Sequence, residues 1–207
     1  MRVLALNGSP RSGGAVARGI AAMAARLAAE GVETETLHVG GLHVRGCMAC
    51  MECRRSGRGC AIGAGGDPLG EAREKAIAAD GLILGSPTYY GGIAGAFKCL
   101  LDRLFFSAPD MSYKVGATVV SLRRSGGVPA FHQLNNYFNL AQMIIAPGIY
   151  WDAIHGNSAE EAGRDEEGLQ ILEAQAANMA WLMKAVAAGR KEAPPPLAER
   201  KLTNFIR

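Results

Sequence analysis

Four of the five cysteines in this chain of 207 residues lie within one short stretch, at positions 47, 50, 53 and 60. Thiolates are soft metal ligands, whereas cysteines that merely pack a core are usually scattered along a sequence. Two gaps of two residues let three thiolates converge on one face of an iron–sulfur cubane, and the longer gap brings a fourth. The spacing therefore predicts a 4Fe-4S cluster held by Cys47, Cys50, Cys53 and Cys60.

Other uses of these cysteines stay open. Structural zinc usually takes two separated pairs, which this consecutive spacing does not provide. Free or redox-active thiols, or another metal, remain alternatives. Four arginines but only one acidic residue, Glu52, lie among the cysteines. The positive charge would offset an anionic cluster and help guide an acidic electron donor. The alternative is that these residues are the charged surface of an ordinary solvated loop. The arginines are Arg45, Arg54, Arg55 and Arg58.

Three glycine-rich loops suggest a second cofactor. The first loop, residues 7–14, precedes a helix whose N-terminal N–H groups favour a phosphate. Its sequence matches neither the Walker nor the dinucleotide pattern. The second has a proline that stiffens it, tyrosines that can stack and glycines that admit a flat ring. The third offers N–H donors and positive charge to a ring that gains electrons. A planar redox ring with one phosphate tail is FMN.

The predicted cofactor-binding residues fall into these three groups. No side chain is predicted to be catalytic, because the cofactor carries the chemistry. The first loop contributes Ser9, Arg11, Ser12, Gly13 and Gly14; the second contributes Pro87, Thr88, Tyr89, Tyr90, Gly91 and Gly92; the third contributes Ser121, Arg124, Gly126 and Gly127.

Alternating strands and helices must position these loops. Apolar residues recur at helical spacing over residues 15–30, 68–79, 94–106 and 166–188, and residues 131–145 are helical at least in part. Strands are expected over residues 2–6, 32–39, 81–85, 114–122 and 149–154. Residues 86–92 are expected to be a loop. Such alternation predicts an α/β fold with a doubly wound, five-stranded parallel sheet in three layers, whose loop tips meet at one edge.

The expected organisation is one domain with two additions. Residues 1–188 form the FMN-binding domain, with a cysteine-rich insert over residues 45–66 after the second strand, and residues 189–207 form a basic, proline-rich tail. The whole net charge of +3 lies in that tail, where five basic residues face two acidic ones. This distribution argues against nucleic-acid binding. Short apolar runs and the lack of a signal peptide argue against a membrane or secreted protein and predict a cytoplasmic one.

Three sets of motifs resemble the NADPH-dependent FMN reductase branch of the flavodoxin-like proteins. They are residues 8–11 (GSPR), residues 85–91 (GSPTYYG) and Lys98 followed by residues 101–103 (LDR). The cysteine spacing is similar to that of the iron–sulfur flavoproteins, whose insert after the second strand carries a 4Fe-4S cluster near FMN. Relatives often have Asn-Thr where this chain has Ala15-Val16, so one side-chain hydroxyl for the phosphate is absent.

The resemblance implies an FMN-dependent oxidoreductase of the iron–sulfur flavoprotein type, usually a homodimer or homotetramer. It would move electrons between the cluster, FMN and a small acceptor such as oxygen, peroxide or a quinone. A small molecule, with NAD(P)H as one possible reductant, or a ferredoxin-like protein would supply the electrons. The alternatives are a cluster-free NAD(P)H-dependent FMN or quinone reductase, and a non-enzymatic flavodoxin-like electron carrier.

Some remaining residues are expected to be structural. Cys99 is predicted to be buried in the core, and the histidines at 38, 43, 132 and 155 are predicted to be structural or on the surface, because none pairs at ligand spacing. Five aromatic residues lie within residues 131–151 and either pack the core or roof the flavin of a neighbouring subunit. They are Phe131, Tyr137, Phe138, Tyr150 and Trp151.

Overall fold

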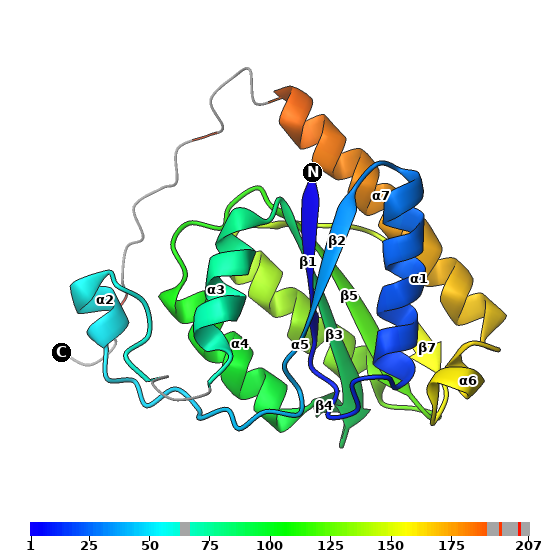
Figure 1. Cartoon of the computed structure of the whole chain (residues 1–207), viewed down its shortest axis with the longest axis horizontal. Helices are drawn as coiled ribbons and strands as arrows, with labels where there is room; N and C mark the ends of the chain where they lie inside the picture. Colours follow the sequence, from blue (N-terminus) through cyan, green and yellow to red (C-terminus); the bar gives the residue numbers. More distant parts are fainter. Residues whose placement is uncertain (63–66, 190–194, 196–202, 204–207) are drawn as a thin grey trace.

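A computed structural model describes residues 1–62, 67–189, 195 and 203 (Figure 1). Over these residues strands and helices alternate along the chain. The strands are β1 (Arg2–Asn7), β2 (Glu33–His38), β3 (Gly81–Tyr89), β4 (Gly92–Ile93), β5 (Val115–Leu122), β6 (Ile144–Ile145) and β7 (Ala153–His155). The helices are α1 (Ala15–Ala29), α2 (Glu52–Ser56), α3 (Leu69–Ala78), α4 (Gly95–Ser107), α5 (Gly127–Leu140), α6 (Ala159–Ala162) and α7 (Glu166–Gly189).

The sheet has the doubly wound parallel topology that the sequence predicts. Its order is β2-β1-β3-β5-β6, and β7 also pairs with β5. All of these pairs are parallel, so the loops after β1, β3, β5 and β7 leave the sheet at one edge. Ligands of such sheets bind beyond the carboxyl ends of the strands.

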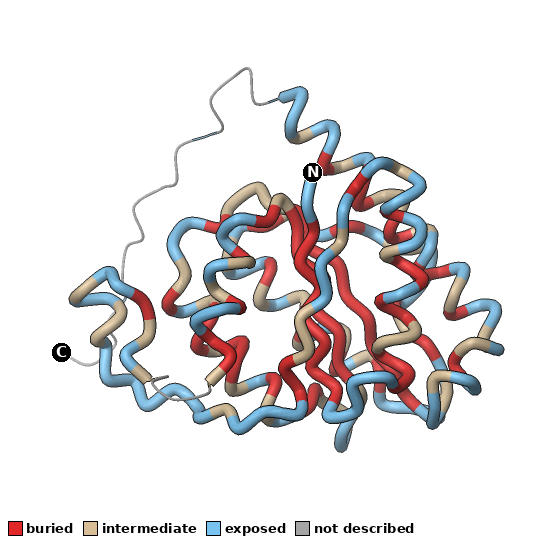
Figure 2. Tube along the Cα trace, viewed as in Figure 1, coloured by how far each residue is buried: buried red, intermediate tan, exposed pale blue. Residues whose placement is uncertain are grey.

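Helices cover both faces of the sheet and make three layers. Consecutive strand residues point to opposite faces, so Leu4 and Leu6 join one core cluster with α3, α4 and α5, whereas Val3 and Ala5 join the other with α1 and α7. The central strands are buried on both faces, as Figure 2 shows. This arrangement explains why β3 and β5 read as continuous apolar runs.

The expected loop over residues 86–92 is instead a strand end and a hairpin. β3 continues to Tyr89 and turns back into β4, with Thr88 opposite Ile93. Pro87 is tolerated here because β1 ends its pairing at Gly85, so β3 has a neighbour on only the β5 side. The sequence prediction of a loop was wrong because proline and glycine usually interrupt a strand.

The outer edge of the sheet also differs from the prediction. Only the last two residues of the strand expected over residues 149–154 are in a strand, β7, and a second short strand, β6, lies where the end of a helix was expected. The two strands pair with opposite ends of β5. The helix expected over residues 131–145 is α5, which begins and ends earlier. The gap between β6 and β7 holds a buried polar group: Thr118 Oγ1 donates to Asp152 Oδ2 at 2.9 Å, and Gln175 donates to the same oxygen and to the Ala146 carbonyl.

The cysteine-rich segment lies beside α4, outside the three layers (Figure 1). The one helix described in it, α2, has no buried residue. Residues 63–66 of the expected insert, and all of the expected tail except residues 189, 195 and 203, lie outside the described residues. Among the described residues, none of the helices combines the length and the hydrophobicity of a membrane span.

Candidate functional site

The loop after β1 is a tight turn that ends at the start of α1. Ser9 is buried; its N–H donates to Asn7 Oδ1 and its Oγ accepts a hydrogen bond from the Arg11 N–H, both at 3.1 Å. Arg11 is exposed, and its guanidinium donates to the Asn157 carbonyl at 3.0 Å. Ser12 and Gly13 are exposed at the tip, and Gly14 is the N-cap residue of α1.

The N-terminus of α1 is open to a ligand. No side chain caps it, and there is no acidic residue in its first turn. An uncapped helix start presents backbone N–H groups and the positive end of the helix dipole. Ala15 and Val16 are buried in the core cluster between α1 and the sheet. The phosphate contacts that remain available are backbone N–H groups and exposed side chains of the loop.

The second and third loops touch each other. A Cβ placed on Gly126 would lie 3.5 Å from both Gly91 Cα and Thr88 Cγ2. Tyr90 and Gly91, with φ angles of 50° and 74°, form the two-residue turn between β3 and β4. Tyr89 and Tyr90 are exposed at this hairpin. The buried Thr88 Oγ1 has no hydrogen-bond partner among the described residues.

The remaining residues of the third group are divided between strand and loop. Ser121 is buried inside β5, in register with Pro87, so it lies below the tip rather than on it. Arg124 is exposed, and Gly126, with a φ of 86°, is the N-cap residue of α5 and has no side-chain cap. A cavity of about 340 Å³ is lined by Arg124, Gly126 and Gly127 together with Tyr150 and Trp151.

This edge of the sheet fits FMN on three observations. The uncapped start of α1 suits a phosphate. The glycine tips of the hairpin and the third loop leave backbone accessible to a flat ring. The orphaned Thr88 hydroxyl needs a hydrogen-bond partner. The role of each individual residue toward FMN stays a prediction.

All four clustered cysteines line one pocket. Its wall also includes Met51 and the residues Arg103, Phe106 and Ser107 of α4. Cys47 and Cys50 are exposed, whereas Cys53 and Cys60 are half-buried. Ala49 and Met51 have positive φ angles of 53° and 61°, which fold the backbone back between successive cysteines.

The four thiols that line this pocket are the kind of donor set that an iron–sulfur cluster takes. In the described chain, no group of three His, Cys, Asp or Glu side chains is close enough to hold one metal ion. In a cubane each thiolate binds a different iron, so the four sulfur atoms stand farther apart than the ligands of one ion. Four thiols around one small pocket, of which two are exposed, are therefore a suitable donor set for a cluster.

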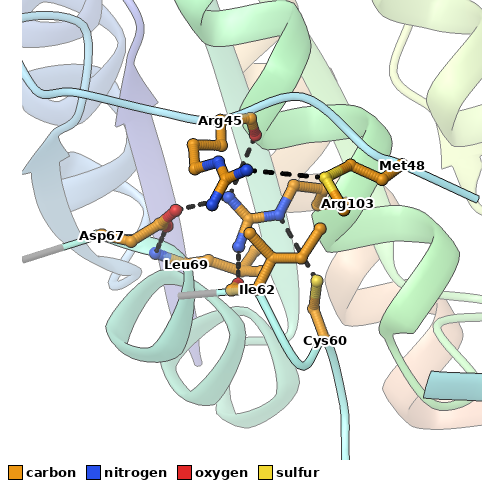
Figure 3. A network of polar contacts seen from close by, with 7 residues as sticks. All are labelled: Arg45, Met48, Cys60, Ile62, Asp67, Leu69 and Arg103. Carbon is orange, nitrogen blue, oxygen red and sulfur yellow. Dashed lines mark hydrogen bonds and ion pairs between the residues drawn. The ribbon is translucent and has the colours of Figure 1, made fainter. Parts of the chain in front are cut away.

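Arg103 is the polar residue of this region that sequence reasoning missed. In the sequence this residue stands out only as part of the LDR motif, which does not predict its burial. In the structure its side chain is completely buried. Figure 3 shows it bonded to both ends of the cysteine segment and to Cys60. The signal that could have revealed it is a charged residue within the apolar run LLDRLFF of α4.

Another charged residue of that motif, Asp102, joins α4 to α5. Lys98 Nζ donates to both Asp102 oxygens at 2.8 Å, and the Tyr137 hydroxyl donates to Asp102 Oδ1 at 2.5 Å. Burial, together with the Asp102 hydrogen bond and charge, raises the pKa of Tyr137 far above its ordinary value, so this phenol stays protonated.

The four arginines around the cysteines are exposed, and three of them contact neighbouring side chains. Arg55 pairs with Glu52 at 3.0 Å, and Arg54 lies 4.6 Å from the centre of the Phe106 ring. Arg45 donates to Met48 Sδ at 3.5 Å.

The expectations for the remaining residues hold in part. Cys99 is half-buried, not part of the core, because it lies where α4 meets the cysteine segment, 3.6 Å from a Cβ placed on Gly46. His43 and His132 are on the surface, His38 bonds to the Ser9 carbonyl and His155 to Asp165. Phe138 packs the core, but Tyr150 and Trp151 are exposed because they follow the break in the edge strand.

Comparisons with known proteins identify the family. The family model of the NADPH-dependent FMN reductases matches residues 1–157. An iron–sulfur flavoprotein of Methanocaldococcus jannaschii is 30% identical over 198 residues, which cover 90% of this chain and 99% of that protein.

Solved structures agree on the fold. A crystal structure of RosB with bound 8-demethyl-8-formylriboflavin-5'-phosphate has a TM-score of 0.72 and 17% identity, covering 100% of this chain and 93% of that one. A flavodoxin from the domain Archaea has a TM-score of 0.60 and 14% identity, covering 89% of this chain and 99% of that one. At these identities the likeness shows the flavodoxin-like fold alone.

The fold, the ligand edge and the family match now converge. They support an enzyme, a flavin-dependent oxidoreductase that uses FMN, over the electron carrier considered as an alternative. This chain belongs to the NADPH-dependent FMN reductase family, within the iron–sulfur flavoprotein branch of the flavodoxin-like superfamily.

Proposed function

We propose that this oxidoreductase carries a 4Fe-4S cluster on Cys47, Cys50, Cys53 and Cys60 and passes electrons between that cluster, FMN and a small acceptor. The observation that carries the proposal is the shared pocket of the four thiols, walled by α4. The name of the Methanocaldococcus jannaschii relative supports it. Oxygen, peroxide and quinones are the acceptor classes that suit a flavin.

The chain's own residues would bind and orient the cofactors. Backbone N–H groups at the start of α1 would hold the FMN phosphate, with Arg11 at its exposed side. The Thr88 hydroxyl would bond the ring edge, and Arg124 would place positive charge near the ring. When bound, FMN exchanges two electrons and the cluster exchanges one at a time, so no side chain needs to act as a nucleophile or general base.

The assembly and partners belong to the same proposal. The exposed Tyr150 and Trp151 beside the third loop suit a homodimer or homotetramer interface. The electron donor is proposed to be a small molecule, NAD(P)H among them, or a ferredoxin-like protein, and the location to be the cytoplasm. Nucleic acid and membranes are not proposed as partners.

Anaerobic purification followed by iron, sulfide and FMN counts tests the cluster. We expect about four irons per chain in the wild type. Cys50→Ala should lose the iron and its broad visible absorbance but keep FMN. Cys99→Ala is the matched control, because it removes a half-buried thiol outside the pocket. Flavin absorbance without iron in the reconstituted wild type would end the cluster proposal.

The cluster-free alternative is favoured by the family model, which describes NADPH-dependent FMN reductases. In that case NADPH oxidation with added quinone would be equally fast in the wild type and in Cys50→Ala. A strong dependence of turnover on Cys50 in iron-loaded protein would exclude this alternative.

A further inference from the structure

Arg103 is the one charged side chain with no exposed surface among the ion pairs of the described chain. It projects from the third turn of α4, whose other buried residues are mainly apolar, such as Leu100 and Leu104. Burying a guanidinium is costly unless its N–H groups are satisfied. A buried arginine at this position therefore needs hydrogen-bond acceptors for its N–H groups.

Those acceptors come from both ends of the cysteine segment, as Figure 3 shows. Arg103 Nη1 donates to the Arg45 carbonyl at 3.1 Å, just before the first cysteine, and also pairs with Asp67. Its Nη2 donates to the Ile62 carbonyl, just after the last cysteine. One guanidinium thus bonds the chain where it enters and where it leaves the pocket.

The same guanidinium also reaches a cysteine directly. Arg103 Nε donates to Cys60 Sγ, with 3.4 Å between the two atoms. Nε–H, two Nη1–H groups and one Nη2–H group account for four of the five donors of an arginine. The acceptors lie in different directions around the planar head, so the three donors of a lysine, which radiate from one nitrogen, cannot reach them all.

The cysteine segment has little else to hold it in shape. Helix α2 has no buried residue, and residues 43–51 form no helix or strand. Two further contacts come from the same end of α4: Arg54 over the Phe106 ring, and Arg73 of α3, which donates to the Ser107 carbonyl and lies 3.3 Å from a Cβ placed on Gly59. Arg54 is exposed and Arg73 is half-buried, whereas the side chain of Arg103 has no exposed surface.

We propose that Arg103 is the positioning residue of the iron–sulfur site: it closes the cysteine segment around the pocket and donates a hydrogen bond to the ligating sulfur of Cys60. The inference rests on the proposed function for the cluster. Its second consequence is electrostatic. A donor and a positive charge at a ligating sulfur stabilise the more negative, reduced cluster, so Arg103 raises the reduction potential of the cluster.

The test compares the wild type with Arg103→Lys, Arg103→Met and the control Lys98→Met, all reconstituted anaerobically. Lys98 is on the same helix and its loss also removes one charge and one ion pair, but that pair is with Asp102 rather than with the insert. We expect both Arg103 variants to keep FMN and to lose iron to a chelator about 10–100-fold more readily than the wild type. Any iron retained in Arg103→Met should show a lower midpoint potential, and Lys98→Met should match the wild type.

Hydrogen exchange of the iron-free proteins separates this inference from the proposed function. Amides of residues 43–62 should exchange faster in Arg103→Lys than in the iron-free wild type, while amides of β3 and β5 stay unchanged. If Arg103→Met does not fold, as judged by lost FMN, Arg103→Lys decides. Folded Arg103 variants with wild-type chelator resistance and wild-type exchange would overturn the inference, whereas a wild type that takes up no iron would overturn the cluster itself.

Discussion

Asp152 is a carboxyl group buried where the edge of the sheet is interrupted. Its Oδ2 accepts hydrogen bonds from Thr118 and Gln175, but its Oδ1 and the Gln175 Oε1 have no partner among the described residues. Loss of solvation raises the pKa of Asp152 to about 7, against the opposing effect of the two donors. The residue is therefore neutral in the folded protein over a range in which it is ionised in the unfolded chain.

This shift predicts that Asp152 makes the protein less stable as pH rises. Below the ordinary pKa of 3.8 both states are protonated, and between 3.8 and about 7 only the folded state holds the proton, so the free energy of unfolding falls across that window. Asp152→Asn removes the titration. Its stability relative to the wild type should increase from pH 4 to pH 8 by up to about 4 kcal/mol, measured by urea unfolding.

The control for this prediction is Glu173→Gln, an exposed carboxylate on the same helix as Gln175. A constant difference between Asp152→Asn and the wild type would show instead that Asp152 is ionised in the folded protein.

Single residues were predictable where local spacing carries the chemistry. The cysteines share a pocket as their spacing suggested, and the loop residues around Gly91 and Gly126 do meet. The hydrogen-bond partners of Arg103 and Asp152 were not predictable, because they depend on which distant segment packs against each residue. The sequence of α4 does not indicate that residues 45, 62 and 67 lie around its third turn.

At the scale of elements, the close packing of the first loop on α4 gives a sharp prediction. A Cβ on Gly8 would lie 2.1 Å from Cγ of the buried Phe97 ring, whereas a Cβ on Gly13 in the same loop would meet nothing within 4 Å. Gly8→Ala should lower the free energy of unfolding of the FMN-free protein by about 1–3 kcal/mol. Gly13→Ala should change it by less than about 0.5 kcal/mol.

Thermal or urea unfolding of the two variants checks this pair. The displaced loop should also weaken FMN binding in Gly8→Ala, which flavin fluorescence titration measures. Equal stability of the two variants would mean that α4 moves away from the loop at little cost.

The longer helices and strands were predicted well. The element boundaries at the sheet edge that carries the three glycine-rich loops were predicted poorly. Helix α1 and strand β5 match their patterns because strong periodicity reflects burial on one face or on both. Helix α5 starts earlier than expected because Gly126 adopts a left-handed conformation as its N-cap and Pro129 is acceptable in a first turn. Glycine and proline interrupt most elements, but here they begin one.

At the scale of the whole molecule, FMN would join loops from distant parts of the chain. A ligand that binds only the folded state stabilises it by about 2.7 kcal/mol when its free concentration is 100 times Kd. For a domain of this size we expect the Tm of the FMN-loaded protein to exceed that of the stripped protein by about 5–10 °C. Differential scanning calorimetry measures this, and identical melting of the two forms would contradict an FMN site at this edge.

The cysteine segment lies outside the three layers and is attached through the far end of α4, while the flavin edge is built from the sheet and the start of that helix. Chemical damage by air would on this account be confined to one appendage. If the chain carries the proposed cluster, loss of iron to oxygen would leave the flavin edge intact, so a preparation handled in air would contain two yellow populations that differ in what they can reduce.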